Sequence, residues 1–167
     1  MLVSTLAGSS TGIANGIGSM AQFNYPSGVA IDPTGAYALV AEWGNSLIRR
    51  IDMATARVAT LAGSTVGVGQ GSTNGIGSMA QFSSPAGVVI DPAGAYALVA
   101  DYGNNLIRRI DMATARVSTL AGSTQGNANG IGSMAQFYYS SRVAIDPTGT
   151  YALVAASFAA SKLRPRL

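Results

Sequence analysis

The stretch from Leu47 to Val58 reads LIRRIDMATARV, and the same residues return in the same order from Leu106 to Val117. Three shorter phrases each occur three times in the chain. They are TLAGS at Thr5, Thr60 and Thr119, NGIGSMAQF at Asn15, Asn74 and Asn129, and IDP at Ile31, Ile90 and Ile145. Self-similarity at a regular spacing is the signature of a repeat architecture. We therefore predict a single repeat domain over residues 1–167, with units at approximately 7–61, 62–120 and 121–167.

Each complete unit contains four strand-like runs separated by turn residues. In the first unit these runs cover residues 28–31, 37–42, 47–52 and 57–61. The second run is apolar at both sets of alternating positions, as expected of a strand covered on both faces. The 21 Gly and 6 Pro of the chain interrupt every candidate helix. Short connections between consecutive runs predict an antiparallel meander of four strands in each unit.

The third unit departs from this pattern and is degenerate. The acidic position of Glu42 and Asp101 becomes Ala156, and nothing in residues 157–167 matches the repeated IRRI strand. Pro165 also cannot donate a ladder hydrogen bond. The third strand of this unit is therefore in doubt, and we expect its first two strands only.

Two further segments lie outside the four-strand pattern. Residues 3–6 match the fourth run of a unit without the three runs that precede it, and we expect them to form an opening strand. The middle copy carries four more residues than the first between its TLAGS and NGIGS phrases, within residues 67–73. An insertion of this kind, rich in Gly, predicts a loop.

The repeated segments resemble a known family. Pro26–Gly35, Ala38–Asn45 and Ile48–Ile51 resemble the NHL repeat, and the second copy is closer still at Val99–Asp101 and Gly103–Arg108. The resemblance implies a β-propeller, commonly six-bladed, that is used mainly for binding proteins or RNA. We therefore expect an all-β fold of β-propeller blades, each a four-stranded antiparallel meander. About three blades are expected, open or completed by oligomerisation.

The number of blades raises the question of how the ring is completed. Closed propellers have about four to eight blades, so we expect this chain to be a fragment of a longer propeller. The alternative is that two copies join as a homodimer. An incomplete ring would expose two apolar blade faces and an unpaired edge.

The charges are few and unevenly placed. Hydrophobic residues make up 48% of the chain and charged residues 10%, and the net charge of +3 comes from Lys162, Arg164 and Arg166 in a basic tail at 161–167. The repeats are therefore neutral, which makes nucleic-acid binding unlikely, and RNA binding through the tail is a second alternative. The apolar runs are too short to span a membrane, and no secretory signal is recognisable, so the compartment is unknown.

The residue types limit the chemistry of the repeats. The chain has no His and no Cys, which excludes the usual nucleophilic triads and ordinary zinc sites. Related propellers of the gluconolactonase-like type imply metal-assisted chemistry, so a hydrolase or lyase with a metal held by acids is the first alternative. We expect no catalytic residue, no metal and no cofactor.

The acidic residues recur at equivalent places, which favours structural roles. An Asp before Pro-x-Gly caps its turn, and one Arg of each IRRI strand is expected to pair with Glu42 or Asp101 on the adjacent strand. The residues predicted to be structural are Asp32, Asp91, Asp146, Arg49 and Arg108.

Aromatic residues cluster in loops predicted to share one side of the sheets. In a four-stranded meander, the turn between strands two and three lies on the same side as the long loop between units. The candidate binding residues on that side are Trp43, Tyr102, Glu42, Asp101, Asn24, Tyr25 and Tyr138, together with Phe23 and Tyr139. Tyr and Trp give large contact area at low entropic cost. The leading hypothesis is a non-enzymatic protein-interaction scaffold with a protein partner. Alternatively, several of these rings pack under the long loops, and Met20 with Phe23 pins such a loop to its blade.

Overall fold

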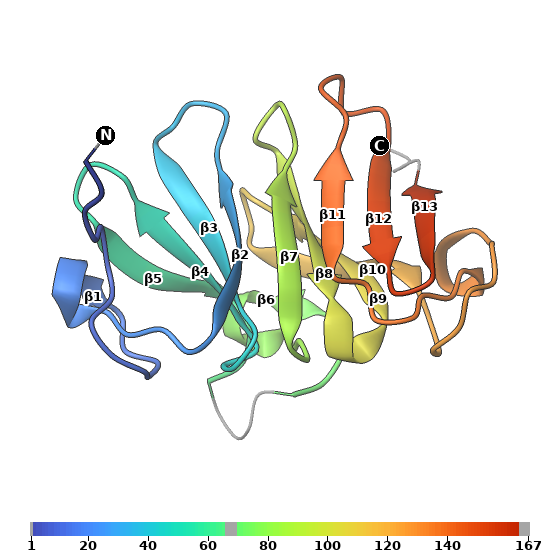
Figure 1. Cartoon of the computed structure of the whole chain (residues 1–167), viewed down its shortest axis with the longest axis horizontal. Coiled ribbons are helices and arrows are strands. Elements are labelled where there is room, and N and C mark those ends of the chain that lie inside the picture. Colours follow the sequence, from blue (N-terminus) through green and yellow to red (C-terminus); the bar gives the residue numbers. More distant parts are fainter. Residues whose placement is uncertain (1, 66–69, 164–167) are drawn as a thin grey trace.

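The computed structural model describes residues 2–65 and 70–163, which form three antiparallel β-sheets (Figure 1). The sheets stand side by side in chain order, with the N-terminus beside the first sheet and the C-terminus beside the third. The first strands of successive units are in contact with one another across the sheets. The arrangement is the one that blades of a propeller adopt.

The first sheet contains the four predicted strands and a short fifth one. In chain order the strands are β1 (Gly16–Ile17), β2 (Pro26–Ile31), β3 (Tyr37–Glu42), β4 (Leu47–Asp52) and β5 (Arg57–Ala62). Consecutive strands from β2 to β5 pair with each other, and β1 pairs with β5 at the outer edge. The sequence did not predict β1, because two residues show no alternation. The long loop brings them against an edge that offers free hydrogen-bonding groups.

The second sheet repeats the first. Its strands are β6 (Gly75–Ile76), β7 (Pro85–Ile90), β8 (Tyr96–Asp101), β9 (Leu106–Asp111) and β10 (Arg116–Gly122). The order β6-β10-β9-β8-β7 matches that of the first sheet. The same sequence phrases therefore produce the same pairing twice.

The third sheet has three strands, which corrects our expectation of two. They are β11 (Arg142–Ile145), β12 (Ala152–Ala156) and β13 (Ala159–Leu163). The third strand forms although the IRRI motif is missing, because its main chain pairs with β12 along five residue pairs. Main-chain hydrogen bonds need no particular side chain, and a two-residue turn at Ser157 and Phe158 joins the strands.

The predicted opening strand at residues 3–6 does not form. A fourth strand needs the third strand of its own sheet as a partner, and the described residues offer none beside it. Leu2 and Val3 are accordingly 94% and 88% exposed. Residues 67–69 of the predicted loop, and residues 164–167 of the predicted basic tail with Pro165, lie outside the described residues. Lys162 belongs to β13.

The described helices are single turns of 3-10 helix. They are η1 (Gly18–Met20), η2 (Gly77–Met79), η3 (Tyr102–Asn104) and η4 (Gly132–Met134). Three of them follow the same NGI phrase, at a Gly with positive φ that other residues adopt with strain. None of the helices in the described part is long enough to cross a membrane.

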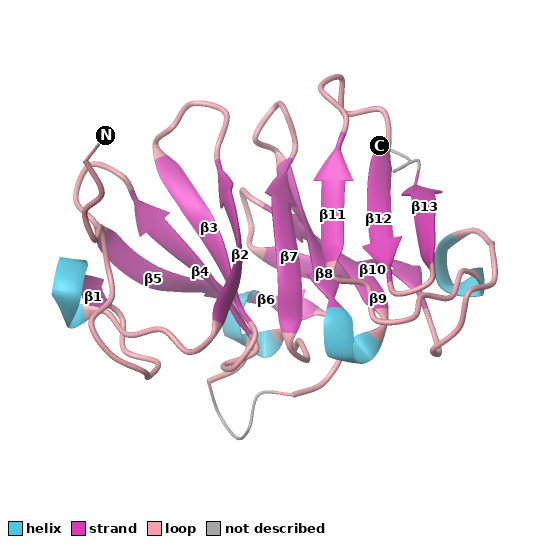
Figure 2. Ribbon diagram, in the orientation of Figure 1, coloured by secondary structure: helices cyan, strands magenta, loops and turns pink. Residues whose placement is uncertain are grey.

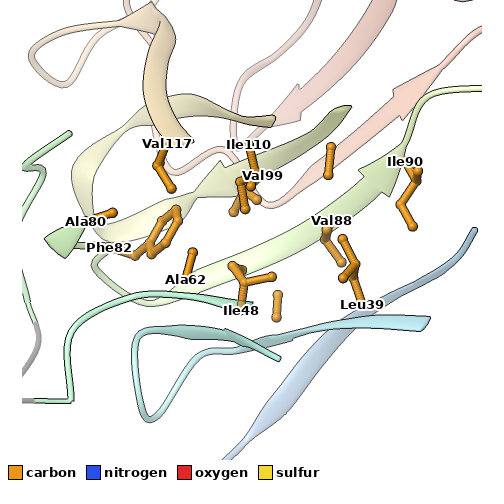
Figure 3. Packing of buried hydrophobic residues seen from close by; sticks show 12 residues of the cluster. Leu39, Ile48, Ala62, Ala80, Phe82, Val88, Ile90, Val99, Ile110 and Val117 are labelled. Atoms are coloured by element: carbon orange, nitrogen blue, oxygen red, sulfur yellow. The ribbon is translucent and has the colours of Figure 1, made fainter. Parts of the chain in front are cut away.

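Two of the apolar clusters in the described residues lie between neighbouring sheets, and a smaller one lies between the first sheet and its own long loop. Figure 3 shows Leu39 and Ile48 of the first sheet facing Phe82, Val88 and Val99 of the second. A second cluster joins the second and third sheets through equivalent positions. Burying a side chain of this size contributes about 1.5–3 kcal/mol. Stacking of whole sheets is therefore the main source of apolar burial in the molecule.

The end sheets leave part of their outer faces uncovered, so the exposure predicted for an open ring holds only in part. On the outer face of the first sheet, Val40, Ile51 and Val58 are buried against the long loop at Ala21 and Phe23. Val29 and Ile31 of β2 are 68% and 62% exposed, whereas Val88 and Ile90 at the same positions of β7 are 7% and 8% exposed. At the other end, Leu153 of β12 is 48% exposed. The difference arises because only the second sheet has a neighbour on both sides.

Candidate functional site

The loops of the three sheets gather at two opposite edges. In Figure 2 the hairpins between the first two strands of each sheet point to the top, and η3 lies at the bottom with the loops that lead into β2, β7 and β11. The turn between the second and third strands therefore shares an edge with the long loops, as the sequence predicted.

The top edge carries the aspartates predicted to cap turns. Asp32 accepts hydrogen bonds from the amides of Thr34 at 3.0 Å and Tyr37 at 2.7 Å, and Asp91 and Asp146 accept the equivalent bonds. Burial acts to raise the pKa of Asp32, but these hydrogen bonds outweigh it and lower the pKa. The three carboxylates are thus engaged with their own turns.

A buried ion pair links the two middle strands of the first sheet, β3 and β4, near the end of β3. The guanidinium of Arg49 contacts the carboxylate of Glu42 at 3.0 Å, and both side chains have no exposed surface. Arg49 also donates to the carbonyls of Gln22 and Ala14, at 3.1 and 3.0 Å, and to the side chain of Asn15 at 2.7 Å. Burial raises the pKa of Glu42 and lowers that of Arg49, while the contact between them acts in the opposite direction. The pair therefore anchors the long loop to the sheet.

The second sheet contains the same pair in Arg108 and Asp101, again at 3.0 Å and without exposed surface. Arg108 donates to the carbonyls of Gln81 and Thr73, at 2.9 and 3.1 Å, and to Asn74 at 2.9 Å. Burial raises the pKa of Asp101 to about 6, although hydrogen bonds and the guanidinium lower it in part. The predicted pairing of one Arg in each IRRI strand with the acid of the adjacent strand is present in both complete units.

The burial of Glu42 and Asp101 corrects their place in the candidate binding site. Both were counted among the loop residues available to a partner, but neither has exposed surface. Their carboxylates are turned inward to the guanidinium, and Asp101 also accepts from the amide of Ser83 at 2.7 Å. These acids hold the loops in position beneath the surface and do not form part of it.

The first sheet presents two exposed rings at the bottom edge. Tyr25 and Trp43 are 74% and 45% exposed, and their rings meet edge to face with centroids 6.2 Å apart. The amide of Trp43 donates to the carbonyl of Tyr25 at 3.0 Å. Asn24 donates through its side chain to Asn45 at 3.2 Å, so it supports the turn. Phe23 lies inside, near the guanidinium of Arg49.

A larger group of rings joins the second and third sheets. Tyr102 stacks on Tyr139 with centroids 4.8 Å apart, Tyr139 meets Tyr138 edge to face at 4.9 Å, and Tyr138 contacts Phe158 at 4.8 Å. Phe158 is 72% exposed, and the three tyrosines are half-buried. The amide of Tyr139 donates to the side chain of Asn105 at 2.9 Å, which ties the two sheets together. We call the surface formed by both groups the aromatic face: Tyr25, Trp43, Tyr102, Tyr138, Tyr139 and Phe158.

Sequence reasoning missed one ring and misplaced the methionine of the long loop. Phe158 was not predicted, because the doubt over the third strand hid the turn in which it lies. The proposed pinning of the long loop by Met and Phe is correct for Phe82 and Phe137, which are buried, and wrong for Met20, which is 74% exposed. The buried residue of that phrase is Ala21, since the 3-10 turn directs the Met side chain outward.

The described residues bring aromatic side chains together and keep acidic ones apart. Among residues 2–65 and 70–163, no three acidic side chains come together as a metal-binding group would require. The predicted candidates Tyr25, Trp43, Tyr102 and Tyr138 lie on one edge, and Asn24 lies beneath two of them. Exposed aromatic groups on rigid turns can bury a partner's apolar surface.

Comparison with known proteins gives the following relatives. No family model matches the chain. The chain is 33% identical over 113 residues to human NHL repeat-containing protein 2, a match that covers 65% of this chain and 15% of that protein. It is 37% identical over 99 residues to Protein SUPPRESSOR OF QUENCHING 1, chloroplastic, from Arabidopsis thaliana, covering 59% of this chain and 9% of that protein. The chain thus spans a small part of the curated relatives it matches.

Solved structures share the fold at low sequence identity. An auxiliary nutrient binding protein from Bacteroides ovatus matches 89% of this chain and 38% of its own, with a TM-score of 0.70 and 21% identity. A chain of a nidogen/laminin complex matches 87% of this chain and 46% of its own, with a TM-score of 0.63 and 16% identity. At this level of identity the likeness concerns the fold alone.

Proposed function

We propose that this chain, whose sheets are blades of an NHL-type β-propeller, is a non-enzymatic protein-interaction scaffold that binds its partner through the aromatic face. The observation that carries the proposal is the continuous contact of Tyr102, Tyr139, Tyr138 and Phe158 across two blades. Rings on adjacent blades keep their relative positions only while the blades stay packed. The surface is therefore preorganised, which lowers the entropic cost of binding.

The polar surroundings support the same function. The ion pairs that underlie the first two sheets are fully buried, and the terminal nitrogens of both guanidinium groups also donate to loop carbonyls, so the pairs tie the loops to the sheets. Tyr25 and Tyr139 both adopt positive φ, of 47° and 52°. Ser84 has the same conformation at the equivalent position of the second sheet, so the left-handed backbone is a feature of the repeated turn, and in the first and third sheets this turn presents a ring.

The test is a double substitution on the aromatic face. Trp43→Ala combined with Tyr102→Ala removes one anchor from each ring group. Because an aromatic anchor at an interface contributes about 2 kcal/mol or more, the loss of even one of the two should lower the affinity for the partner at least about thirtyfold. Proteins captured by the full chain would be identified, and the dissociation constant of each would be measured with wild-type and variant protein.

A matched control lies at the opposite edge. Met53 is 37% exposed in the turn between β4 and β5, and Met53→Ala should leave the affinity unchanged. Equal binding by the wild type and the Trp43→Ala, Tyr102→Ala variant would remove the aromatic face from consideration.

A further inference from the structure

The opening segment of the chain repeats the fourth strand of the second sheet. Residues 3–9 read VSTLAGS, and the same sequence stands at 117–123, where nearly all of it belongs to β10. β10 lies between two partners, since it pairs with β9 on one side and with β6 on the other. Residues 3–6 carry the same side chains but form no strand. The segment therefore has the sequence of an inner strand without the neighbours that such a strand needs.

The third sheet has these neighbours without the strand. Among the described residues, the outer edge of β13 has no pairing strand, because the order of that sheet is β11-β12-β13. Gly130–Ile131 corresponds to β1 and β6, which pair with the fourth strands of their sheets, but it forms no strand. Ile131 is 83% exposed, whereas Ile76 of β6 is 42% exposed. Both edges therefore offer main-chain hydrogen-bonding groups to one more strand.

The outer faces of the two end sheets match the two sides of a junction that the chain already contains. Leu39 of the first sheet lies in one apolar cluster with Ile90 of the second (Figure 3). In the repeated phrases, the exposed Leu153 of the third sheet takes the place of Leu39, and the exposed Ile31 of the first takes the place of Ile90. The two outer faces are therefore complementary to each other, and an interface with two different sides joins copies head to tail.

The opening segment is already held beside one of these faces. The amide of Gly8 donates to the carbonyl of Gly18 at 3.0 Å, as the amide of Gly63 donates to the carbonyl of Gly77 at 3.2 Å. Gly63 directly follows β5, the fourth strand of one sheet, and Gly77 belongs to the loop that leads into the next sheet. Gly8 is thus placed, relative to the first sheet, like the end of a fourth strand from a preceding sheet. In Figure 1, β13 of the same chain lies at the far end of the row of sheets.

We infer that residues 3–9 of a second copy of this chain form the fourth strand of the third sheet, antiparallel to β13. The register of β9 with β10 places Thr5 opposite Ser161 and Val3 opposite Leu163. On its other side the strand faces Gly130, as β10 faces β6. The same junction forms twice, so two copies of three sheets close a ring within the range of about four to eight blades. The inference does not rest on the proposed function, because the junction uses strand edges and sheet faces.

An introduced disulfide tests the pairing directly, because the chain has no Cys. Residues opposite each other in antiparallel strands have Cα atoms about 4.5–5.5 Å apart, which a disulfide can span. Thr5→Cys with Ser161→Cys should therefore give covalent dimers under mild oxidation. Non-reducing electrophoresis shows the dimers, and mass spectrometry of the bridged peptides identifies the two cysteines.

The control for this disulfide shifts one cysteine by a single residue. In Thr5→Cys with Lys162→Cys, the second thiol lies on the opposite face of the strand, so the yield of dimer should be at least about tenfold lower. A bridge between residues 5 and 161 within one chain, or equal yields of dimer from the two variants, would overturn the inference.

Association in solution provides the second test. Sedimentation of the full chain should show a dimer that dissociates on dilution. Consecutive amides of a strand point to opposite sides, so Ser4→Pro with Thr5→Pro removes one donor toward β13 and one toward the loop. Because each ring contains two junctions, the dissociation constant of the dimer should rise at least about thirtyfold. The single chain should keep its fold, since residues 3–6 form no strand in it. Ser4→Ala with Thr5→Val keeps both amides and should stay within about threefold of the wild type.

The packing of the sheet faces is tested separately by Ile31→Lys. The side chain is exposed in the single chain, but a lysine there would be desolvated in the junction, so the dissociation constant should rise at least about thirtyfold. Met20→Lys is the control, because Met79 at the same place of the second sheet stays 65% exposed although that sheet has a neighbour on both sides. A monomeric wild type, open-ended oligomers in place of a dimer, or a dimer unaffected by both the proline and the Ile31→Lys variants would overturn the inference.

Discussion

The second and third sheets have the same strand register but different centres. In the second, Arg108 and Asp101 form a buried pair that reaches into the long loop. In the third, Ser161 and Ala156 occupy these positions, and neither side chain is charged. Both sheets keep the same loop hydrogen bonds and the same buried Phe. The loop conformation is therefore specified by its main chain and its Phe, and the ion pair is not required to form it.

Each member of such a buried pair is tolerated only while the other is present. Desolvating two charges costs several kcal/mol, and their contact offsets that cost only while both remain. The third sheet has no charged pair at these positions, so it does not pay the desolvation cost. This difference predicts that removing a single member from the second sheet is far more damaging than its absence from the third.

The largest expected effect follows from breaking the pair in the second sheet. Arg108→Met leaves the carboxylate of Asp101 buried without its guanidinium, and the free energy of unfolding should fall by about 3–5 kcal/mol. Urea denaturation of the full chain measures the loss. Ser161→Ala, at the matching position of the third sheet, should change stability by less than about 0.5 kcal/mol.

The double variant Arg108→Met with Asp101→Ala provides the control for desolvation. Removing the orphaned carboxylate should restore part of the stability lost in the single variant, because no unpaired charge stays buried. If Arg108→Met alone cost less than about 1 kcal/mol, the pair would be no more than a space-filling contact.

Much of the fold could be predicted from the sequence, because the complete units repeat both alternation and turn residues. The predicted runs 37–42 and 47–52 coincide with β3 and β4. The strand β13 could not be predicted, since AASKL has no apolar alternation and forms through main-chain pairing alone. The strand predicted at residues 3–6 does not form, because a strand-like sequence needs a neighbouring strand to pair with.

The candidate site was predicted only in part for a related physical reason. The edge on which Trp43 and Tyr102 lie follows from meander geometry alone, and the structure places both there. The side chains of Glu42 and Asp101 point inward because each carboxylate contacts the arginine on the adjacent strand. The sequence alone does not show this orientation. The absence of the pair from the third sheet is visible only once Ser161 is known to pair with Val154.

The next largest expected effect concerns the first strands of the second and third sheets, β7 and β11, which contact each other. A Cβ added at Gly87 of β7 would lie 2.9 Å from the carbonyl oxygen of Ser141 on the neighbouring sheet. Gly87→Ala should therefore destabilise the protein by about 1–3 kcal/mol through overpacking. The equivalent residue of the third sheet is Arg142, which is exposed.

Arg142→Ala is the matched control and should change stability by less than about 0.5 kcal/mol. Thermal or urea unfolding of both variants gives the comparison. A Gly87→Ala variant as stable as the wild type would show that neighbouring sheets can separate slightly without loss, and that their spacing is not fixed by this contact.

The smallest expected effect is an opposite response to pH in the two sheets. In the second sheet, burial raises the pKa of Asp101 from 3.8 to about 6. In the third, burial acts to raise the pKa of Asp146, but hydrogen bonds from Thr148 and from the amide of Tyr151 outweigh it and lower the pKa to about 2. The folded protein thus holds the proton of Asp101 more tightly than the unfolded chain does, and that of Asp146 less tightly.

The sign of each contribution to stability follows from linkage. The contribution of Asp101 is fully present below its unfolded pKa near 3.8 and is lost as the pH rises through about 6. That of Asp146 is present above pH 3.8 and is lost as the pH falls through about 2. NMR titration of the carboxyl carbons should show the two midpoints, and urea unfolding of Asp146→Asn should lack the wild type's loss between pH 4 and 2. A midpoint for Asp101 below 4 would mean that the contact with Arg108 outweighs burial. The buried pair would then make a net favourable contribution to the stability of the second sheet. The third sheet, which lacks the pair, would be less stable for that reason.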